Sequence, residues 1–206
     1  MNAFFHHLSS VYEAGHREEI PDLLSDARFA DADRNAEAAV LIAVTDRAQA
    51  DGGPGVILTQ RPQGMRDHPG QVAFPGGKLD PGENPIEAAL REAEEELALD
   101  RGHVRIIGET DRYQTGTGFN VTPVLGVIPP DLTFSPNPGE VEAWFEAPLS
   151  LLLARENWQR QEVFWQGAMR GYLELHFEGF RIWGVTAAII ANLSRRITPE
   201  RLFDGS

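Results

Sequence analysis

Residues 77–99 read GKLDPGENPIEAALREAEEELAL, and this stretch decides the fold that we expect. Four apolar residues in it recur with the period of an amphipathic helix: Ile86, Leu90, Ala93 and Leu97. Pro85 suits the first turn of a helix, because the N–H that proline lacks would have no partner there. The spacing therefore predicts a helix over residues 84–97 that buries its apolar stripe.

Charged residues divide into two sets on the flanks of this predicted helix. At about 100° per residue, Glu92, Glu95 and Glu96 fall on one flank. Glu87 and Arg91 fall on the other flank, where we expect them to pair at i, i+4. The three glutamates lie near the helix C-terminus, where the helix dipole disfavours anions, and we expect them to have no cation of their own.

Two interpretations of the acidic flank stay open at this point. It is a solvated surface, as on most helices, or it binds a cation. The flank follows a Gly76-Gly77 loop, and glycine lets the backbone approach a ligand closely. Carboxylates that converge with backbone carbonyls suit hard cations, so the second interpretation predicts Mg²⁺ or Mn²⁺.

The same stretch resembles the Nudix box, the sequence motif of the Nudix hydrolases. The matching positions are Gly77, Glu83 after five residues and, after seven more, Arg91, Glu92, Glu95, Glu96 and Leu97. Ala98 stands where the motif normally has a glycine, which affects the turn after the helix and not the carboxylates. The resemblance implies an α+β fold, a Nudix-type αβα sandwich with a mixed central sheet.

The resemblance also implies roles for particular residues. The metal ligands that it implies are Glu92, Glu95, Glu96 and the carbonyl of Gly77. Glu83 and Arg91 would form an ion pair that braces the loop against the helix, whereas the residues alone suggest that Arg91 pairs with Glu87 on the surface. Glu94 occupies a variable place in the motif and lies on the wrong flank of the helix, so we leave it out of the site.

The segment before the box resembles the additional motif of the coenzyme A pyrophosphatase branch of the same family. Its matching positions are Leu58, Thr59, Arg61, Arg66, Gly70, Phe74, Pro75, Gly76 and Gly77. Pro62 replaces the small residue that usually follows the first arginine. Guanidinium groups suit bidentate recognition of phosphate, so we expect Arg61, Arg66 and His68 to bind the substrate. The alternative is that they are ordinary loop residues.

One further carboxylate is a candidate for the site. Glu140 follows Asn137-Pro138-Gly139 in an expected loop, and a carboxylate from this region often completes the site in Nudix enzymes. Glu142 lies close by but next to an expected strand, which makes Glu140 the better candidate. The alternative for Glu140 is an acid exposed on the loop.

The rest of the chain reads as mixed strands with a few helices. We expect strands near residues 38–45, 56–61, 104–110, 120–128, 141–145, 163–164 and 172–177, and one short extended piece at residues 71–74. Residues 180–183 lead into the last expected helix. Helices are expected near residues 4–16, 148–155 and 185–195. We therefore divide the chain into an N-terminal helical appendage, residues 1–34, and a Nudix hydrolase domain, residues 35–206.

Composition excludes several classes of protein. The 206 residues include 31 acidic residues, 18 Lys or Arg and no cysteine, and the formal charge is −13. Without cysteine there is no disulfide, thiolate metal site or cysteine nucleophile. The negative charge argues against binding to nucleic acid or to an anionic membrane. No stretch has the length of a membrane span or the pattern of a secretory signal, so we expect a cytoplasmic protein. A homodimer stays open.

These observations lead to one hypothesis and two rivals. The hypothesis is metal-dependent hydrolysis of the diphosphate of coenzyme A or its thioesters, which gives adenosine 3′,5′-bisphosphate and 4′-phosphopantetheine or its acyl derivative. One rival is another Nudix specificity, such as a nucleotide sugar or a dinucleotide. The other rival is a Nudix-fold binding protein without turnover, whose expected sign is a lost carboxylate. All three glutamates of the box are present.

Overall fold

A computed structural model describes residues 2–26, 36–65, 68–165 and 168–203. Its helices are α1 (Asn2–His16), α2 (Pro85–Leu97), α3 (Leu149–Leu153), α4 (Gly184–Arg196) and α5 (Pro199–Phe203). The strands of the main sheet are β1 (Ala36–Thr45), β2 (Gly55–Gln60), β3 (Val72–Ala73), β4 (Gly76–Lys78), β5 (Arg105–Glu109), β6 (Tyr113–Gln114), β7 (Phe119–Ile128) and β8 (Ala143–Pro148). A smaller sheet contains β9 (Gln159–Trp165), β10 (Ala168–Phe177) and β11 (Phe180–Trp183).

The main sheet is mixed, as expected. Strands β1 and β7 run parallel at its centre, paired from Ala36 with Phe119 to Thr45 with Ile128. The other pairings are antiparallel, and the order along the sheet is β3, β2, β1, β7 and β5. Short strands β4 and β6 and strand β8 pair with β1, β7 and β2 respectively. The prediction of an α+β fold with a mixed sheet is confirmed.

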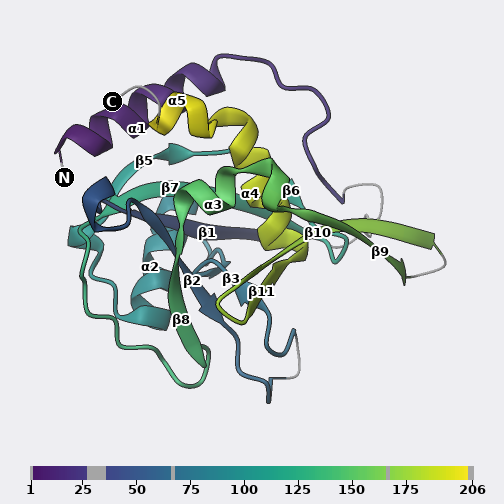
Figure 1. The fold of residues 1–206 in the computed structure, drawn as a ribbon. Coiled ribbons are helices and arrows are strands. Elements are labelled where there is room, and N and C mark those ends of the chain that lie inside the picture. Colours follow the sequence, from purple (N-terminus) through teal and green to yellow (C-terminus); the bar gives the residue numbers. More distant parts are fainter. Residues whose placement is uncertain (1, 27–35, 66–67, 166–167, 204–206) are drawn as a thin grey trace.

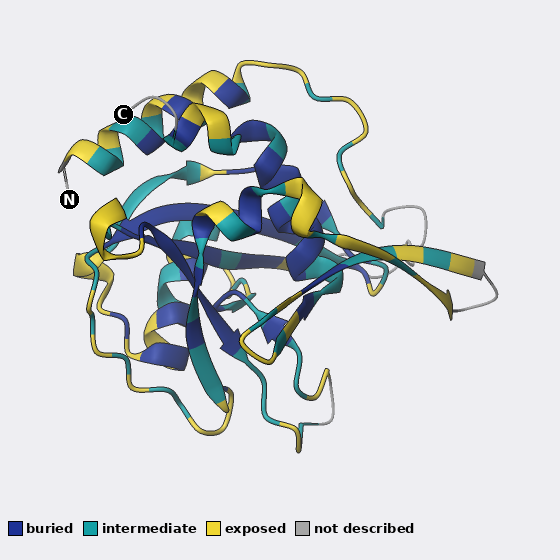
Figure 2. Cartoon of the chain, in the orientation of Figure 1, coloured by how far each residue is buried: buried dark blue, intermediate teal, exposed yellow. Residues whose placement is uncertain are grey.

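Helices cover both faces of this sheet, because its central strands are apolar on both sides. Along β1, Ile42 and Val44 belong to one core cluster, which also contains residues of α1, α3 and α4. The alternate residues Leu41 and Ala43 belong to a second cluster, which contains the buried face of α2. Figures 1 and 2 show the buried central strands between these two helical layers. This is the expected αβα sandwich.

Helix α2 begins and ends with defined caps. The Asn84 side chain accepts a hydrogen bond from the Glu87 N–H while the Glu87 carboxylate accepts one from the Asn84 N–H, a capping box. Pro85 occupies the first turn, as the sequence predicts. Ala98 ends the helix in the left-handed conformation, at φ 56° and ψ 33°. The turn that glycine favours is therefore retained with alanine, at a conformational cost.

The buried face of α2 is rotated relative to the expected stripe. Its buried residues are Ala88, Ala89, Ala93, Glu96 and Leu97. Ile86 and Leu90 are only half-buried. Small alanine side chains face the sheet, which allows the helix to lie close to β1. The expected stripe differs because it was chosen by hydrophobicity, which ranks Ile and Leu above Ala. The rotation brings Glu96, which belongs to the acidic flank, to the buried side of the helix.

The N-terminal helix α1 packs on the main layers. Leu8 and Val11 are buried in the first core cluster, and Figure 1 shows α1 lying beside α5. Arg196 of α4 donates hydrogen bonds to the carbonyls of Gly15 and Glu18, and ties α1 to the domain. The helix forms as predicted, and the proposed boundary at residue 34 lies outside the described residues.

Some expected elements differ in extent. Val141 and Glu142 precede strand β8, which begins at Ala143, and the helix expected over residues 148–155 spans only Leu149–Leu153. The short elements β4, β6 and α5 have no periodic signal in the sequence, because pairing and burial by distant residues define them. Within the described ranges, no helix has the length and apolar character needed to cross a membrane.

Candidate active site

Three carboxylates from two distant parts of the chain meet at the C-terminal half of α2. Glu92 and Glu96 come from the helix, and Glu140 comes from the connection between β7 and β8. One oxygen of each carboxylate lies within 4.8 Å of the others. We call Glu92, Glu96 and Glu140 the acidic cluster. Such a set of oxygen donors is the kind that hard divalent cations prefer.

The loop that carries Glu140 is fixed to the end of the helix. The N–H of Ser135 donates to the carbonyl of Leu97 at 2.9 Å, and the N–H of Asn137 donates to the carbonyl of Glu96 at 2.8 Å. The last carbonyls of a helix have no partner within it, and here the loop supplies two donors. The N–H of Glu140 in turn donates to the carbonyl of Asn137 at 3.0 Å. These backbone contacts place Glu140 beside the helix. Because they do not depend on residue type, the sequence does not predict them.

Two glycines of β4 lie against the acidic cluster. A Cβ atom at Gly77 would clash with the carboxylate of Glu92, and one at Gly76 would clash with the backbone of β1 at Ala39 and Val40. The N–H of Gly76 points to Glu96 Oε1 at 3.4 Å. Glycine is therefore required at residue 76, where the backbone of β1 leaves no room for a Cβ, and a Cβ at residue 77 would displace the Glu92 carboxylate.

The buried carboxylate of Glu96 has too few partners to compensate its charge. Its exposed fraction is 7%. Its pKa is raised to about 8, mainly by burial and also by the nearby carboxylates of Glu92 and Glu140, while the Gly76 N–H and Arg61 act in the opposite direction. Burial also raises the pKa of Glu92, although Arg91 opposes this shift. A divalent cation would compensate this concentration of negative charge, so the residues present fit such a cation.

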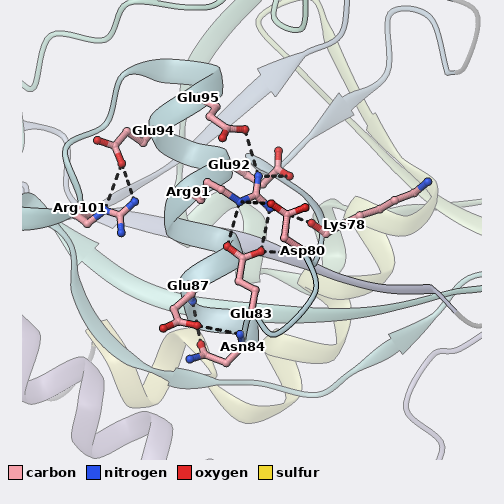
Figure 3. A network of polar contacts seen from close by, with 10 residues as sticks. All are labelled: Lys78, Asp80, Glu83, Asn84, Glu87, Arg91, Glu92, Glu94, Glu95 and Arg101. Carbon is pink, nitrogen blue, oxygen red and sulfur yellow. Dashed lines mark hydrogen bonds and ion pairs between the residues drawn. The ribbon is translucent and has the colours of Figure 1, made fainter.

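Arg91 braces the loop of the box against the helix (Figure 3). Its Nε and one terminal nitrogen donate to the two oxygens of Glu83, each at 3.0 Å, and the latter nitrogen also donates to the carbonyl of Lys78 at 3.0 Å. This bidentate pair lowers the pKa of Glu83. The implied bridge between Glu83 and Arg91 is confirmed. The surface pair of Arg91 with Glu87 is wrong, because Glu87 caps the helix instead.

Arg91 also pairs with the acidic flank of α2. The expectation that these glutamates have no cation of their own is therefore wrong. Its other terminal nitrogen donates to Glu92 at 2.9 Å and to Glu95 at 3.1 Å. The flank therefore has a cation, because residue 95 follows residue 91 by the i, i+4 spacing of neighbours on a helix. Glu95 is 53% exposed and lies on Arg91, outside the acidic cluster. Its role as a metal ligand stays a prediction.

Glu94 points away from the site, as the helical wheel predicts. It accepts from Arg101 at 2.9 Å and 3.2 Å on the opposite flank of α2 (Figure 3). Its side chain is 49% exposed. Glu94 is therefore a matched control for substitutions of Glu92 and Glu96.

Arg61 is a cation close enough to the acidic cluster to act on Glu96. It directly follows β2, and its backbone pairs with residues 70 and 71. Its Nε is buried and has no hydrogen-bond partner among the described residues. Its charge acts on Glu96, whose pKa it lowers. Glu142 accepts from the N–H of Gln63 at 3.0 Å and so holds the turn after Arg61, a role for which the sequence offers no signal.

The other two residues expected to bind the substrate are less defined. His68 is exposed and has a left-handed backbone, with φ 54°. Its carbonyl accepts from the N–H of Gln71 at 3.2 Å, and no side-chain contact fixes its ring within the described chain. Arg66 lies outside the described residues. The role of both residues stays a prediction.

This fold and site define a class of enzyme in which a glutamate-rich helix of an αβα sandwich binds divalent cations beside a glycine strand. The chain belongs to the Nudix family, because residues 35–166 match the NUDIX domain. Nudix hydrolases generally use divalent metal ions and act on small nucleotide substrates. The protein is accordingly a Nudix pyrophosphohydrolase, an enzyme that hydrolyses nucleoside diphosphate derivatives.

Sequence relatives agree with the family, and a solved structure agrees with the fold. The uncharacterised Nudix hydrolase NudL of Escherichia coli O7:K1 is 43% identical over 162 residues, which cover 78% of this chain and 82% of the relative. NudL of Escherichia coli strain K12 is 42% identical with the same coverage. The crystal structure of the M. smegmatis Nudix hydrolase RenU is similar in fold, with a TM-score of 0.53 and 22% identity over 77% of this chain and 83% of that chain.

Proposed function

We propose that this enzyme hydrolyses the diphosphate linkage of coenzyme A or its thioesters with Mg²⁺ or Mn²⁺. The products are adenosine 3′,5′-bisphosphate and 4′-phosphopantetheine or its acyl derivative. The observation that supports this most is the position of Arg61. It comes from the segment that resembles the coenzyme A pyrophosphatase motif. Its charge acts on Glu96, and its buried Nε has no hydrogen-bond partner among the described residues.

The residues of the site divide into those that hold the cation and those that hold the substrate. Glu92, Glu95, Glu96 and the carbonyl of Gly77 would hold the metal, and Glu140 completes the site. When bound, the cation supplies charge neutralisation at the diphosphate and lowers the pKa of an attacking water. Arg91 is a positioning residue, because it fixes the loop of Glu83 and contacts Glu92.

Arginine binds the phosphates that lie away from the bond that breaks. The guanidinium of Arg61 offers donors in a planar fork that matches phosphate oxygens. Arg66 and His68 follow on the same loop and would add donors to the same group. This arrangement answers the problem that the net charge of −13 poses for an anionic substrate, because local cations, protein and metal together, face the phosphates.

A panel of substrates with identification of products by mass tests this function. We expect coenzyme A and acetyl-coenzyme A to be hydrolysed with Mg²⁺ or Mn²⁺ far faster than a nucleotide sugar or a dinucleotide. If the enzyme preferred a nucleotide sugar or a dinucleotide, the proposed substrate class would be wrong, but the assignment as a pyrophosphohydrolase would stand. Binding of nucleotides without turnover of any of them would leave a binding protein.

Substitution of Arg61 tests the part of the proposal that concerns the substrate. We expect Arg61→Ala to raise KM for coenzyme A more than it lowers kcat, because this arginine binds phosphate that does not react. Arg61→Lys should recover part of the charge effect and little of the bidentate geometry. Arg66→Ala should behave in the same way as Arg61→Ala. An unchanged KM in both alanine variants would make these residues ordinary loop arginines.

A further inference from the structure

Strand β9 of the hairpin formed by β9 and β10 lies at the edge of the smaller sheet. Figure 1 shows this hairpin extending beyond the sandwich. In the smaller sheet the order is β11, β10 and β9, so within the described residues β9 is an edge strand whose one partner is β10. Five of its six residues with a described side chain, Gln159 to Phe164, are exposed. Among the described residues no strand pairs with its outer edge, which can therefore pair with another strand.

The same hairpin concentrates exposed apolar side chains. Large hydrophobic residues with high exposure in the described chain are Leu24 and three residues of this hairpin, Val163 at 45%, Phe164 at 68% and Met169 at 59%. Phe164 and Met169 are direct cross-strand partners and share one face. Proteins usually shield an exposed apolar edge strand, since it is a template for pairing with a second chain.

Two opposite charges lie on the same face of β9, and no partner for either is found among the described residues. Arg160 and Glu162 are two residues apart and both exposed, and neither has a hydrogen bond or an ion pair within the described ranges. Gly171 of β10 lies opposite Glu162, so no side chain on β10 covers that position. The guanidinium of Arg160 lies next to Gly171, where a Cβ would be 3.4 Å from its Nε. This edge therefore carries one positive and one negative group in sequence.

We propose that β9 pairs with β9 of a second copy of this chain, antiparallel, with Gln161 on the two-fold axis. A two-fold contact makes residue i face residue j and residue j face residue i. With Gln161 opposite itself, Arg160 faces Glu162 of the second copy, and Glu162 faces Arg160 of the second copy. The contact forms two cross-strand ion pairs and a continuous six-stranded sheet. This inference is independent of the proposed function.

The charges select this register over its neighbours. In an antiparallel strand pair, a shift of register that keeps the hydrogen-bonding pattern also keeps each side chain on the same face of the sheet. The neighbouring registers are therefore those centred on Arg160 and on Glu162. A shift in one direction sets Arg160 against Arg160 of the second copy, and a shift in the other direction sets Glu162 against Glu162. Like charges directly opposite destabilise a strand pair. Only the register centred on Gln161 pairs both charges.

Charge reversal with sedimentation velocity over a concentration series tests the contact. We expect Arg160→Glu and Glu162→Arg each to weaken self-association at least about tenfold, because each variant sets like charges opposite each other at two positions. The double variant Arg160→Glu with Glu162→Arg should regain the association of the unmodified chain. An equimolar mixture of the two single variants should also associate. An unmodified chain that stays monomeric at all concentrations, or a double variant no better than the single ones, would overturn the proposal.

Cysteine cross-linking tests the register in a chain that has no cysteine of its own. Gln161→Cys should form a disulfide-linked dimer on mild oxidation, because directly opposite residues have Cα atoms about 5 Å apart, within the range of a disulfide. Val163→Cys lies on the same face but about 13 Å from its copy along the strand, so it should not cross-link. Retained hydrolase activity shows that both variants fold. Equal cross-linking of the two variants, or cross-linking of Val163→Cys alone, would contradict this register.

Discussion

At the scale of single residues, Glu96 combines two opposing demands. Its carboxylate lies in the acidic cluster, and it is also almost fully buried with one long hydrogen bond from Gly76. A buried charge without a partner destabilises a folded protein. The same charge is what a divalent cation needs from the site. We therefore expect the Glu96 carboxylate to be needed for activity and its negative charge to destabilise the metal-free protein.

Neutral substitutions of the acidic cluster test the first of these effects. We expect Glu92→Gln and Glu96→Gln each to lower kcat by about a hundredfold or more, because each removes one negative ligand with little change in shape. Circular dichroism should show that both variants remain folded. Glu94→Gln, on the opposite flank, should retain full activity. An equal loss in Glu94→Gln would mean that the assignment of α2 faces is wrong.

The second effect is a dependence of stability on pH in the absence of metal. The pKa of Glu96 is raised from 4.5 to about 8 in the folded protein. The folded state thus binds this proton more tightly than the unfolded state. Its contribution to stability is complete below about pH 4.5 and is lost as the pH rises through about 8.

Melting temperatures measured in a chelator check this dependence. Because Gln stays neutral at every pH, the difference in melting temperature between Glu96→Gln and the unmodified enzyme should grow in favour of Glu96→Gln from pH 5 to pH 9. The melting temperature of Glu94→Gln should change with pH in the same way as that of the unmodified enzyme. A constant difference for Glu96→Gln would show that this carboxylate has an ordinary pKa.

At the scale of elements, helix α2 shows what local sequence can and cannot predict. Its period, its proline in the first turn and its glutamate flank are encoded within 14 residues, and the helix forms where they predict. The face that it buries was not predictable, since Ala88 and Ala89 face the sheet for reasons of closeness and not of hydrophobicity. Glu140 was a candidate from its loop, but only its contacts with the helix end bring it to Glu96.

The C-terminal cap of α2 gives a prediction about stability. Ala98 is exposed and left-handed, a conformation that costs a residue with a Cβ about 1 kcal/mol or more and costs glycine little. We expect Ala98→Gly to raise the free energy of unfolding in urea by about 1 kcal/mol. Ala154→Gly is the control. Ala154 caps α3 with φ −73°, where alanine is unstrained, so this variant should lose stability.

At the scale of the whole molecule, the packing of the N-terminal helix is the feature that the sequence indicates least, although the helix itself forms as predicted. Composition indicates a polar, mixed segment, and we expected an appendage on that ground. Leu8 and Val11 lie in the core cluster together with residues of the strands and of α4, which are far along the chain. The tie between Arg196 and the carbonyls of Gly15 and Glu18 involves backbone acceptors, which leave no trace in residue types. The boundary at residue 34 stays a prediction.

Substitution of Leu8 measures how far α1 contributes to the domain. Its side chain is 1% exposed. We expect Leu8→Ala to lower the free energy of unfolding by about 2–4 kcal/mol, since it creates a cavity in the main core. Leu24→Ala, at a position 41% exposed, should cost far less. If Leu8→Ala left the unfolding curve unchanged, α1 would be a true appendage.

The site of bond cleavage tests the assignment of the acidic cluster as the catalytic element. Hydrolysis of an acyl-coenzyme A in ¹⁸O-labelled water, followed by mass spectrometry of all products, measures it directly. Metal held by the cluster at the diphosphate predicts one label on a phosphate of either adenosine 3′,5′-bisphosphate or the acyl phosphopantetheine, with the thioester and the 3′-phosphate intact. Label in a released acyl carboxylate or in free inorganic phosphate would contradict it, because neither reaction breaks the diphosphate.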